Sequence, residues 1–411
     1  MESKVKRTLH TSQWVIAKVK QCFKFRNGKG FSGVLKSFPD EEFCHPVYGG
    51  NGIIGYSDKY LLEEPTIIVG RVGEYCGNVF KTQNKSWVTD NAMMVCDILL
   101  EDYDIDFWVV MLNSLSFNHY SDSTGQPKIT QGGIGAISFK YPSEKEEQTA
   151  IANILSKVDK AIASVQNSIA AAERLKKSLM QNVLTGKMKP DGTFRTSEEF
   201  YIDENFGKVP VGWEVKRIKD FGEVQTGKTP PTDEPEVFSD KENGFMFVTP
   251  GDLDVAKYIE ETERYVSEKG IRYSYVLPKG TVCEVCIGST IGKIGITTAT
   301  CCSNQQITSV IVNNEHDAEY LYYAMLSRKE HFKSVAGINA TPQINKSGYS
   351  KYRVLCPKDK LEQIAIAKRI SSVDKTINEQ EQKIKSLERL KKSLMQNLLT
   401  GKKRLFYSNR Y

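Results

Sequence analysis

The segment GEVQTGKT at residues 222–229 has residue types and a spacing that could bind nucleotide phosphates. It matches the P-loop pattern G-x-x-x-x-G-K-[ST] letter for letter. A working P-loop needs a buried strand before it and a helix directly after it, whose amides face the phosphates. The preceding VKRIKDF is too charged for a central strand, and Pro230-Pro231 remove an amide where the helix would begin. The segment therefore predicts a basic, glycine-containing turn that suits nucleic-acid phosphates, and no ATP site.

Four of the nine cysteines form a second group with possible chemistry, because cysteine thiolates bind zinc. Cys283 and Cys286 form a C-x-x-C motif, and the adjacent pair Cys301-Cys302 follows. Structural zinc sites usually use two separated pairs, and adjacent cysteines fit that geometry poorly. An internal repeat at an offset of 215 residues aligns Cys283 with Ile68, whose side chain cannot bind a metal. The pattern therefore predicts the core of a strand and no metal site.

The remaining composition is that of a globular protein without catalytic motifs. The chain has 411 residues and a net charge of +6, a basic excess that permits a polyanionic partner. No apolar run approaches the roughly 18 residues of a membrane span, and the N-terminal MESKVKRTLHTSQW lacks the apolar core of a signal peptide. The five histidines have no metal-binding spacing, and G-x-S-x-G, H-E-x-x-H and the N-P-P-[YF] signature of adenine methyltransferases are missing. We therefore expect a non-catalytic, cytoplasmic protein with reduced thiols.

The chain is built from two copies of one unit. The segment ERLKKSLMQNVLTGK at 173–187 recurs at 388–402 with 14 of 15 residues identical, and 144–187 matches 359–402 at 26 of 44 positions. Upstream the identity fades, but the same offset aligns Gly73, Gly77, Pro127, Ile129 and Pro142 with Gly288, Gly292, Pro342, Ile344 and Pro357. Trp14 and Trp213 begin similar segments at an offset of 199. Each copy therefore combines a variable part with a nearly constant tail.

Each constant tail has the heptad pattern of a long amphipathic helix. The proline before each tail prevents an earlier start, and Gly186 and Gly401 can cap the C-terminal ends. A helix over 143–185 has about 43 residues and is about 65 Å long. The apolar seam comprises Ile151, Leu155, Val158, Ile162, Val165, Ile169, Ala172, Leu179 and Val183 in the first copy, and Ile366, Ile370, Val373, Ile377, Gln380, Ile384, Leu387, Leu394 and Leu398 in the second. Lys176 and Lys391 interrupt the seam at equivalent positions.

A helix of this length cannot bury its apolar face alone. Each seam could pack on its own domain, on another chain, or on the other seam. We favour an antiparallel pair within the chain, because one chain holds two matching seams and duplicated units commonly pack about a two-fold axis. In that arrangement Gln380 either sets the register of the pair or faces water.

The variable parts contain short β-branched and aromatic runs separated by glycine- and asparagine-rich turns, with occasional helices such as 318–332. This pattern predicts an α+β fold, with two globules separated by two long antiparallel helices packed as a coiled coil. The predicted boundaries are 1–142 for the first globule, 143–187 for its helix, 188–212 for a linker, 213–357 for the second globule, 358–402 for its helix and 403–411 for a basic tail.

Together these features resemble the specificity subunit of Type I restriction–modification enzymes, over almost the whole length of the chain. The motifs that carry the resemblance are the tails EQ-AIA…VDK…LKKSLMQ-LLTGK, the GKVPVGWEV entry to the second half, and GKTP with FVTPGDL (247–253). In the first half they are FRNGKGF, PVYGGNGIIGY (46–56) and GRVGEYCGNV (70–79). The tail is the most specific of these motifs.

The resemblance implies that each globule is a target-recognition domain that reads one half of a bipartite site in double-stranded DNA. It also implies that the helix pair sets the spacer between the half-sites and docks two methyltransferase subunits and, through them, restriction subunits. Those partners would use S-adenosylmethionine, and ATP with magnesium, and neither cofactor would bind this chain. The alternatives are a non-catalytic scaffold with two binding modules and no nucleic-acid partner, and a P-loop ATPase.

Positive and polar residues of the glycine-rich loops are the candidate DNA contacts. Lysine and arginine can neutralise phosphates, while amide, guanidinium and aromatic side chains can contact base edges. The candidates in the first globule are Arg26, Lys29, Tyr48, Asn51, Arg71, Tyr75, Lys81 and Lys85, and those in the second are Lys228, Thr229, Lys293, Asn304, Gln305 and Lys346.

Overall fold

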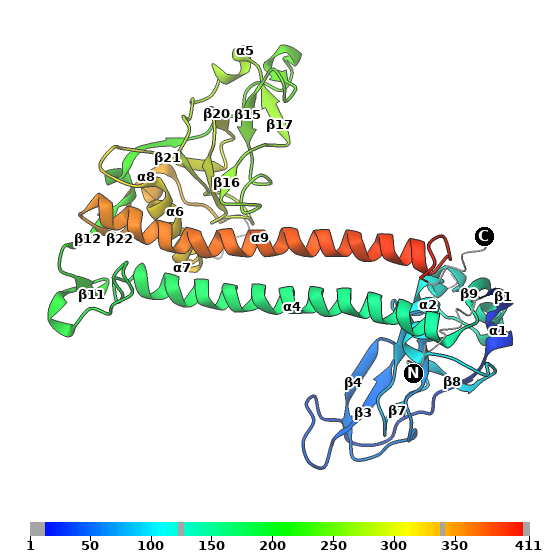
Figure 1. Ribbon diagram of the computed structural model, residues 1–411. Coiled ribbons are helices and arrows are strands. Elements are labelled where there is room, and N and C mark those ends of the chain that lie inside the picture. The colour runs from blue at the N-terminus through cyan, green and yellow to red at the C-terminus, as the bar shows by residue number, and fades with distance from the viewer. Residues whose placement is uncertain (1–12, 122–126, 338–341, 406–411) are drawn as a thin grey trace, which may run out of the picture. The chain divides into compact units, whose positions relative to one another are not determined.

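The computed structural model describes residues 13–121, 127–337 and 342–405 of the chain (Figure 1). The protein divides into two compact units, each of which combines one globular domain with parts of two long helices. The first unit contains the described residues up to Asn167 and those from Gln382 onwards, and the second contains Ser168–Glu381. No helix in these described ranges is long and apolar enough to cross a membrane.

The first globular domain is an α+β fold whose strand pairs are mostly antiparallel. Its two ends are joined because β1 (Trp14–Lys18) pairs with β9 (Ser138–Pro142), with Trp14 opposite Pro142. One sheet has the order β2 (Phe23–Asn27), β8 (Ala92–Ile98), β5 (Ile67–Gly70) and β6 (Val79–Lys81), and another has the order β4 (Gly52–Ser57), β3 (His45–Gly49) and β7 (Trp87–Val88). The helical elements are α1 (Val19–Cys22), α2 (Ile105–Ser114), η1 (Phe117–Tyr120) and α3 (Gln131–Gly135).

The second globular domain repeats this plan. Its ends are joined by β12 (Trp213–Arg217) and β22 (Arg353–Pro357), again with tryptophan opposite proline. One sheet has the order β13 (Gly222–Thr226), β21 (Ile307–Val312), β18 (Val282–Val285), β19 (Ile294–Thr297) and β16 (Tyr258–Ile259), and another has the order β14 (Phe238–Ser239), β17 (Arg264–Val266), β15 (Phe245–Val248) and β20 (Cys301–Ser303). The helical elements are η3 (Ile218–Asp220), η4 (Pro235–Val237), α5 (Glu268–Ile271), α6 (Ala318–Ser327), α7 (Lys329–Val335) and α8 (Lys346–Lys351). The order β13-β21-β18-β19 corresponds to β2-β8-β5-β6, which confirms the internal repeat.

Each domain continues into one long helix, α4 (Lys145–Val183) or α9 (Lys360–Leu398), of 39 residues. Each helix is therefore about 58 Å long, which is shorter than the length expected from the sequence. As expected, a proline precedes each helix, here as the last residue of β9 or β22. Gly186 and Gly401, which follow the helices, have the left-handed conformation, with φ of 70° and 72°.

Ion pairs join the two helices at the positions where lysine interrupts the heptad seam. Lys176 Nζ lies 2.6 Å from Asp374 Oδ1 in the second unit, and Lys391 Nζ lies 2.6 Å from Asp159 Oδ1 in the first. The two pairs are equivalent in the internal repeat. From Asp159 to Lys176 the chain advances 17 residues along α4, and from Lys391 to Asp374 it goes back 17 residues along α9. The helices are therefore antiparallel.

The heptad positions are withdrawn from solvent, whereas most residues between them are exposed. In the first unit, Ile151, Leu155 and Leu398 belong to the core of the first domain. In the second unit, the seam residues that join the domain core are Leu179, Val183, Ile366 and Ile370. Elsewhere Val158 and Val165 are buried, and the half-buried seam positions are Ile162, Ile169, Ala172, Val373, Ile377, Gln380, Ile384, Leu387 and Leu394.

The segment between the two halves, which the sequence predicts as an irregular linker, contains a β-hairpin. After η2 (Ser197–Glu199), β10 (Phe200–Asp203) pairs antiparallel with β11 (Gly207–Pro210). Asp203 Oδ1 closes the turn by accepting hydrogen bonds from the backbone amides of Asn205, at 2.8 Å, and Phe206, at 2.9 Å. Strands of four residues are too short to give a clear period, so only this turn chemistry marks the hairpin in the sequence.

The P-loop-like segment is a strand followed by an irregular loop. Residues 222–226 form β13, which pairs with β21 along its whole length. Residues 227–234 are not helical, and the next helical element is the three-residue η4. This segment therefore provides no helix N-terminus at which a nucleotide phosphate could bind.

The four clustered cysteines are buried in the second domain. Cys283 lies in β18, Cys286 follows that strand, and Cys301 and Cys302 begin β20. Burial raises the pKa of Cys283 to about 12, which keeps this thiol protonated. Among the described residues, no group of three or more His, Cys, Asp or Glu side chains is arranged to hold a metal ion.

Reversing one charge of the Lys176–Asp374 pair should destabilise the helix pair, and reversing both should restore it. Lys176→Asp places two carboxylates together and is expected to lower the free energy of unfolding by about 1 kcal/mol, most of which Asp374→Lys should recover. The side chains of Lys391 and Asp159 are 34% and 48% exposed, against 26% and 17% for the first pair, so the same exchange should matter less there. Urea unfolding followed by circular dichroism, run as two double-mutant cycles, measures both couplings. Strictly additive losses in both cycles would contradict a role for these pairs in helix pairing.

Glu284 of β18 is a carboxyl group buried in the second domain. It is 1% exposed, and its Oε2 has no hydrogen-bond partner among the described residues. Burial raises the pKa of this carboxyl from 4.5 to about 8. The folded state therefore binds this proton more tightly than the unfolded state, so the domain should lose stability as the pH rises from about 4.5 to about 8.

Replacing Glu284 with Gln should remove this pH dependence. We expect Glu284→Gln to gain stability relative to the natural chain by up to roughly 1.4 kcal/mol for each pH unit between the two pKa values. Urea unfolding of both proteins at about pH 5 and about pH 8 measures the difference, with Glu223→Gln at an exposed site as the control. A difference that is the same at both pH values would contradict a raised pKa at Glu284.

Candidate nucleic-acid interface

Several loops of the first domain meet where β2 and β5 end and β8 begins. We call the loops 27–30, 49–52, 70–77 and 88–92 the first loop edge. Main-chain hydrogen bonds hold these loops to one another and to the segment that precedes α3: Lys29 N donates to Val88 O at 2.9 Å, Arg71 N to Asn91 O at 2.9 Å, and Ile129 N to Arg71 O at 2.8 Å. The edge is therefore a rigid frame made mainly of backbone groups.

The second domain has the same frame, in the loops 226–229, 248–253, 285–292 and 303–307, which we call the second loop edge. The equivalent hydrogen bonds are Lys228 N to Ser303 O at 2.9 Å, Cys286 N to Gln306 O at 2.8 Å, and Ile344 N to Cys286 O at 2.9 Å. The two domains therefore present Lys29 and Lys228 at equivalent places.

A glycine precedes each of these lysines because two loops come into close contact there. A Cβ at Gly28 would lie 2.1 Å from Thr89 O, and one at Gly227 would lie 2.2 Å from Asn304 O. No real Cβ tolerates such distances. These glycines therefore bring the following lysine to the loop edge.

Each loop edge also contains a turn bounded by glycines. Gly73 and Gly77 have φ of 89° and 93°, and Gly288 and Gly292 have φ of 97° and 82°. This left-handed conformation favours glycine over any other residue. The amide of the first glycine donates to the carbonyl of the aligned proline, at 2.9 Å in both domains. The glycines and prolines aligned from the sequence therefore occupy equivalent structural positions.

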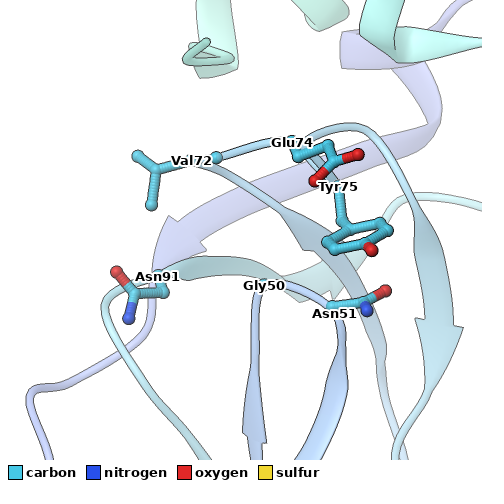
Figure 2. Close-up of a pocket in the computed structure, with 7 residues that line it drawn as sticks. Gly50, Asn51, Val72, Glu74, Tyr75 and Asn91 are labelled. Carbon is cyan, nitrogen blue, oxygen red and sulfur yellow. The ribbon is translucent and has the colours of Figure 1, made fainter. Parts of the chain in front are cut away.

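An open hollow of about 230 Å³ lies in the first loop edge (Figure 2). Its lining residues are Gly50, Asn51, Val72, Gly73, Glu74, Tyr75 and Asn91. The side chains of Asn51 and Tyr75 lie on one side of the hollow, and that of Asn91 lies on the other. Tyr75 is 49% exposed, and both asparagines are exposed. The hollow therefore offers polar groups and an aromatic ring to a ligand from solvent.

Five of the predicted contacts in the first domain lie at or beside the loop edge, namely Arg26, Lys29, Asn51, Arg71 and Tyr75. Arg71 is half-buried, and its Nη1 donates to a main-chain carbonyl at 3.4 Å. Asn51 Oδ1 accepts a hydrogen bond from Asn78 at 3.5 Å. The structure thus brings together residues that lie up to 49 positions apart in the sequence.

The other three predicted contacts in the first domain have different surroundings. Tyr48 is 4% exposed, and its hydroxyl accepts a hydrogen bond from a backbone amide at 3.1 Å, so its ring packs in the interior instead of facing a ligand. Lys81 forms an ion pair with Asp106 at 2.8 Å. Lys85 lies in a turn with φ of 47°, and its ammonium is 5.6 Å from the ring centroid of Tyr60.

In the second domain the predicted contacts form local polar pairs. Thr229 Oγ1 donates to Gln305 Oε1, and Lys346 Nζ donates to Gln225 Oε1 at 3.3 Å. The bond to Gln225 places Lys346, at the start of α8, beside β13, the strand that leads to Lys228.

Two further predicted contacts of the second domain are engaged within it. Asn304 Oδ1 accepts from the amide of Gln306 at 3.1 Å. Lys293 Nζ donates to Pro250 O at 3.3 Å, and its side chain is half-buried. Both side chains therefore help to hold the second loop edge.

Some polar residues of the loop edges were not predicted as contacts. Glu74 and Asn91 line the hollow in the first domain, and Gln131 Nε2 donates to Asn27 Oδ1 at 3.5 Å. The internal repeat gives a signal for Gln131, which the offset of 215 aligns with the predicted contact Lys346. It gives none for Asn91, which aligns with Gln306, a residue that is not among the predicted contacts.

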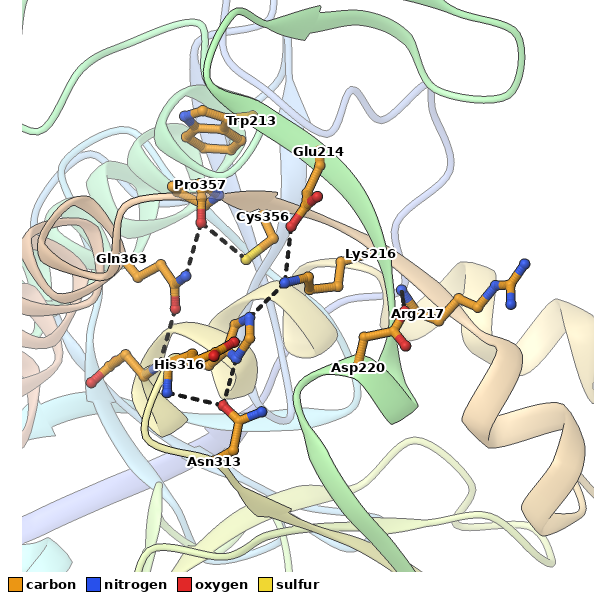
Figure 3. A network of polar contacts seen from close by, with 12 residues as sticks. Trp213, Glu214, Lys216, Arg217, Asp220, Asn313, His316, Cys356, Pro357 and Gln363 are labelled. Carbon is orange, nitrogen blue, oxygen red and sulfur yellow. Dashed lines mark hydrogen bonds and ion pairs between the residues drawn. The ribbon is translucent and has the colours of Figure 1, made fainter.

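A buried glutamine joins each domain to its long helix. Gln363 of α9 accepts from Asp317 N at 3.0 Å and donates to Pro357 O at 2.8 Å (Figure 3). Gln148 of α4 makes the equivalent bonds in the first domain, both at 2.9 Å. Both glutamines are fully buried. The first turn of each helix is therefore fixed to the strand pair at the ends of its domain.

His316 lies beside this junction and has a structural environment. Its Nε2 is 2.8 Å from Lys216 Nζ, and its Nδ1 is 2.7 Å from Asn313 Oδ1 (Figure 3). Burial and the adjacent ammonium lower the pKa of His316, which favours the neutral ring. A neutral ring can accept from the ammonium through Nε2 and donate to the amide oxygen through Nδ1. We therefore assign His316 to the packing of the domain on its helix.

Comparison with known proteins gives one consistent family. The model of the Type I restriction modification DNA specificity domain matches residues 11–174 and again residues 210–389. The HindI specificity subunit of Haemophilus influenzae is 30% identical over 198 residues, which are 47% of this chain and 42% of that protein. The MjaVIII specificity subunit of Methanocaldococcus jannaschii is 26% identical over 369 residues, which are 86% of this chain and 80% of that protein. The matches to HindI and to two other relatives span less than half of those proteins.

A solved structure has the same fold. The S subunit of a Type I restriction–modification system from M. genitalium superimposes with a TM-score of 0.63 at 16% identity, covering 96% of this chain and 98% of that one. Both loop edges and most of both long helices lie inside the two segments that match the family model. The chain therefore belongs to the Type I restriction modification DNA specificity domain family, with one copy of the domain in each half.

Proposed function

We propose that this chain selects the DNA target of a Type I restriction–modification complex, with each globular domain reading one half of a bipartite site. The observation that carries the proposal is the pair of loop edges. They share one main-chain frame and an equivalent lysine, while their outward side chains differ. Two readers with the same scaffold and different side chains suit a target whose two halves differ in sequence.

The loop edges contain both classes of group that DNA recognition needs. Lys29 and Lys228 are exposed and can neutralise phosphates, as can Arg26 and Lys346. Amide and aromatic side chains at the same edges can contact bases. The phosphate contacts would position each domain, and the base contacts would supply its sequence preference.

The helix pair would set the spacer between the half-sites. Each helix is about 58 Å long, comparable with the roughly 35–70 Å that one to two turns of DNA occupy. Each residue added to or removed from a helix changes its length by about 1.5 Å, so helix length would affect the spacer that is accepted.

The same helices would dock two methyltransferase subunits. Leu175 and Leu390 are equivalent in the repeat and are 57% and 47% exposed, and basic residues flank both. Two identical faces suit two copies of one partner. In this proposal S-adenosylmethionine and ATP with magnesium bind to the methyltransferase and restriction subunits, and the complex works in the cytoplasm.

Reconstitution with the cognate methyltransferase subunits tests this function. We expect the complex to methylate adenines at one two-part sequence with a constant spacer, because both domains must bind their half-sites at the same time. Mapping of methylated adenines on genomic DNA measures the motif, and the methyltransferase subunits alone are the control. Failure to assemble, or methylation without sequence preference, would contradict the proposal.

Removing the two edge lysines should weaken binding to all sequences alike. Lys29→Ala and Lys228→Ala should each reduce the slope of log affinity against log salt by about 1, as expected for one lost phosphate contact. Titration of the complex with labelled duplex at several salt concentrations measures the slope. Lys59→Ala, at an exposed site beyond the far end of β4, is the matched control. An unchanged slope in both edge variants would show that these lysines do not face the phosphates.

A further inference from the structure

The two glycine-bounded turns differ at all three positions between their glycines, and the first two of these positions lie at the surface. Between Gly73 and Gly77 the first domain has Glu74-Tyr75-Cys76, and between the equivalent glycines the second has Ser289-Thr290-Ile291. The third residue is buried in both turns, at 3% and 4% exposure, so it serves packing. Glu74 and Tyr75 are exposed, as is Ser289, and Thr290 is half-buried. The third position stays apolar in both turns, whereas the chemistry of the first two, surface positions changes from one domain to the other.

In the first domain these two positions line the hollow of the loop edge. Asn91 lies across the hollow from Tyr75 and is replaced in the second domain by Gln306. The hydrogen bond from Arg71 N to Asn91 O, at 2.9 Å, corresponds to the one from Cys286 N to Gln306 O, at 2.8 Å, in the second domain. The backbone beside the hollow is therefore arranged alike in both domains. At these positions the first loop edge differs from the second by a carboxylate (Glu74), an aromatic ring (Tyr75) and a shorter amide side chain (Asn91 in place of Gln306).

The chemistry of Glu74 restricts what such a hollow can bind on DNA. A carboxylate only accepts hydrogen bonds, and phosphates repel it. On a DNA-facing surface its favourable partner is the exocyclic amino group of cytosine or adenine. An asparagine amide can pair with the edge of adenine, and an exposed tyrosine ring can pack against a base or methyl group.

We propose that Glu74, Tyr75 and Asn91 form the base-reading site of the first domain, and that it takes a base edge that carries an exocyclic amino group. This assignment rests on the proposed function and deepens it, because it separates base-reading residues from phosphate-binding ones. Lys29 positions the domain on any DNA, whereas the three residues of the hollow determine which half-site the domain accepts. The residues at the equivalent positions of the second domain are Ser289, Thr290 and Gln306.

Exchange of the two turn residues tests the assignment in the assembled complex. The double variant E74S/Y75T gives the first turn the outward side chains of the second without changing the glycines. We expect the mapped methylation motif to lose preference roughly five- to hundredfold at one or more positions of one half-site, the size of effect that a lost base contact has. The other half-site and the spacer should stay unchanged, which shows within the same experiment that the complex is folded and assembled.

The matched control is E101S/Y103T, which changes the same residue types at exposed positions beyond the opposite end of β8. It should leave both half-sites unchanged. If E74S/Y75T assembles and its motif is that of the natural chain, the assignment is wrong although the proposed function stands. If the natural chain itself directs methylation to no two-part motif, the proposed function fails first. If E74S/Y75T does not assemble, the variant Asn91→Gln tests the assignment instead, because it gives the first domain the amide side chain of the second. A methylation motif of Asn91→Gln identical to that of the natural chain would then overturn the proposal.

Discussion

The structure depends on two reciprocal ion pairs, Lys176–Asp374 and Lys391–Asp159, that connect the long helices. A lysine in an apolar seam is destabilising unless its ammonium meets a carboxylate, and here each lysine meets one from the other helix. Each pair combines the lysine of one repeat with the aspartate of the other, so neither repeat satisfies its own charges. A parallel pair, or a pair shifted by one heptad, would leave these charges in the seam without partners. The ion pairs therefore select the antiparallel register.

Contacts at the helix ends explain why each domain needs both helices. In the first unit Ile151 of α4 and Leu398 of α9 enter one core, and in the second Leu179 of α4 and Ile366 of α9 do the same. Arg195, which follows α4, pairs with Glu362 at the start of α9. In the same way Arg404, which follows α9, lies 3.4 Å from a carboxylate at the start of α4. The end of one helix thus supports the beginning of the other within each unit.

The sequence predicts a residue's role where that role follows from the residue's own chain segment. The heptad pattern predicts both helices, and the aligned glycines and prolines predict the turns of the loop edges. Where contacts between distant segments determine the role of a residue, the sequence pattern does not predict it. Tyr48 lies in a glycine-rich segment that indicates a surface loop, yet cross-strand pairing buries its ring. The segment IDFWVVML of α2 is mostly apolar and is typical of a buried strand as much as of a helix, although Asp104 caps the helix by accepting a hydrogen bond from an amide of its first turn. Lys176 looked like a break in the seam because its partner is 198 residues away.

The loop edges show how one scaffold can present two surfaces with different side chains. Their frame consists of main-chain hydrogen bonds and of glycines with left-handed φ, and neither depends on the outward side chains. Packing constrains only the inward position, which Cys76 and Ile291 fill with an apolar side chain. Substitutions at the outward positions can therefore change what the edge binds while the fold and its attachment to the helix stay intact. The glutamines that fix each domain to its long helix, and the ion pairs between the helices, lie outside these loops, so the outward side chains can change without altering these contacts.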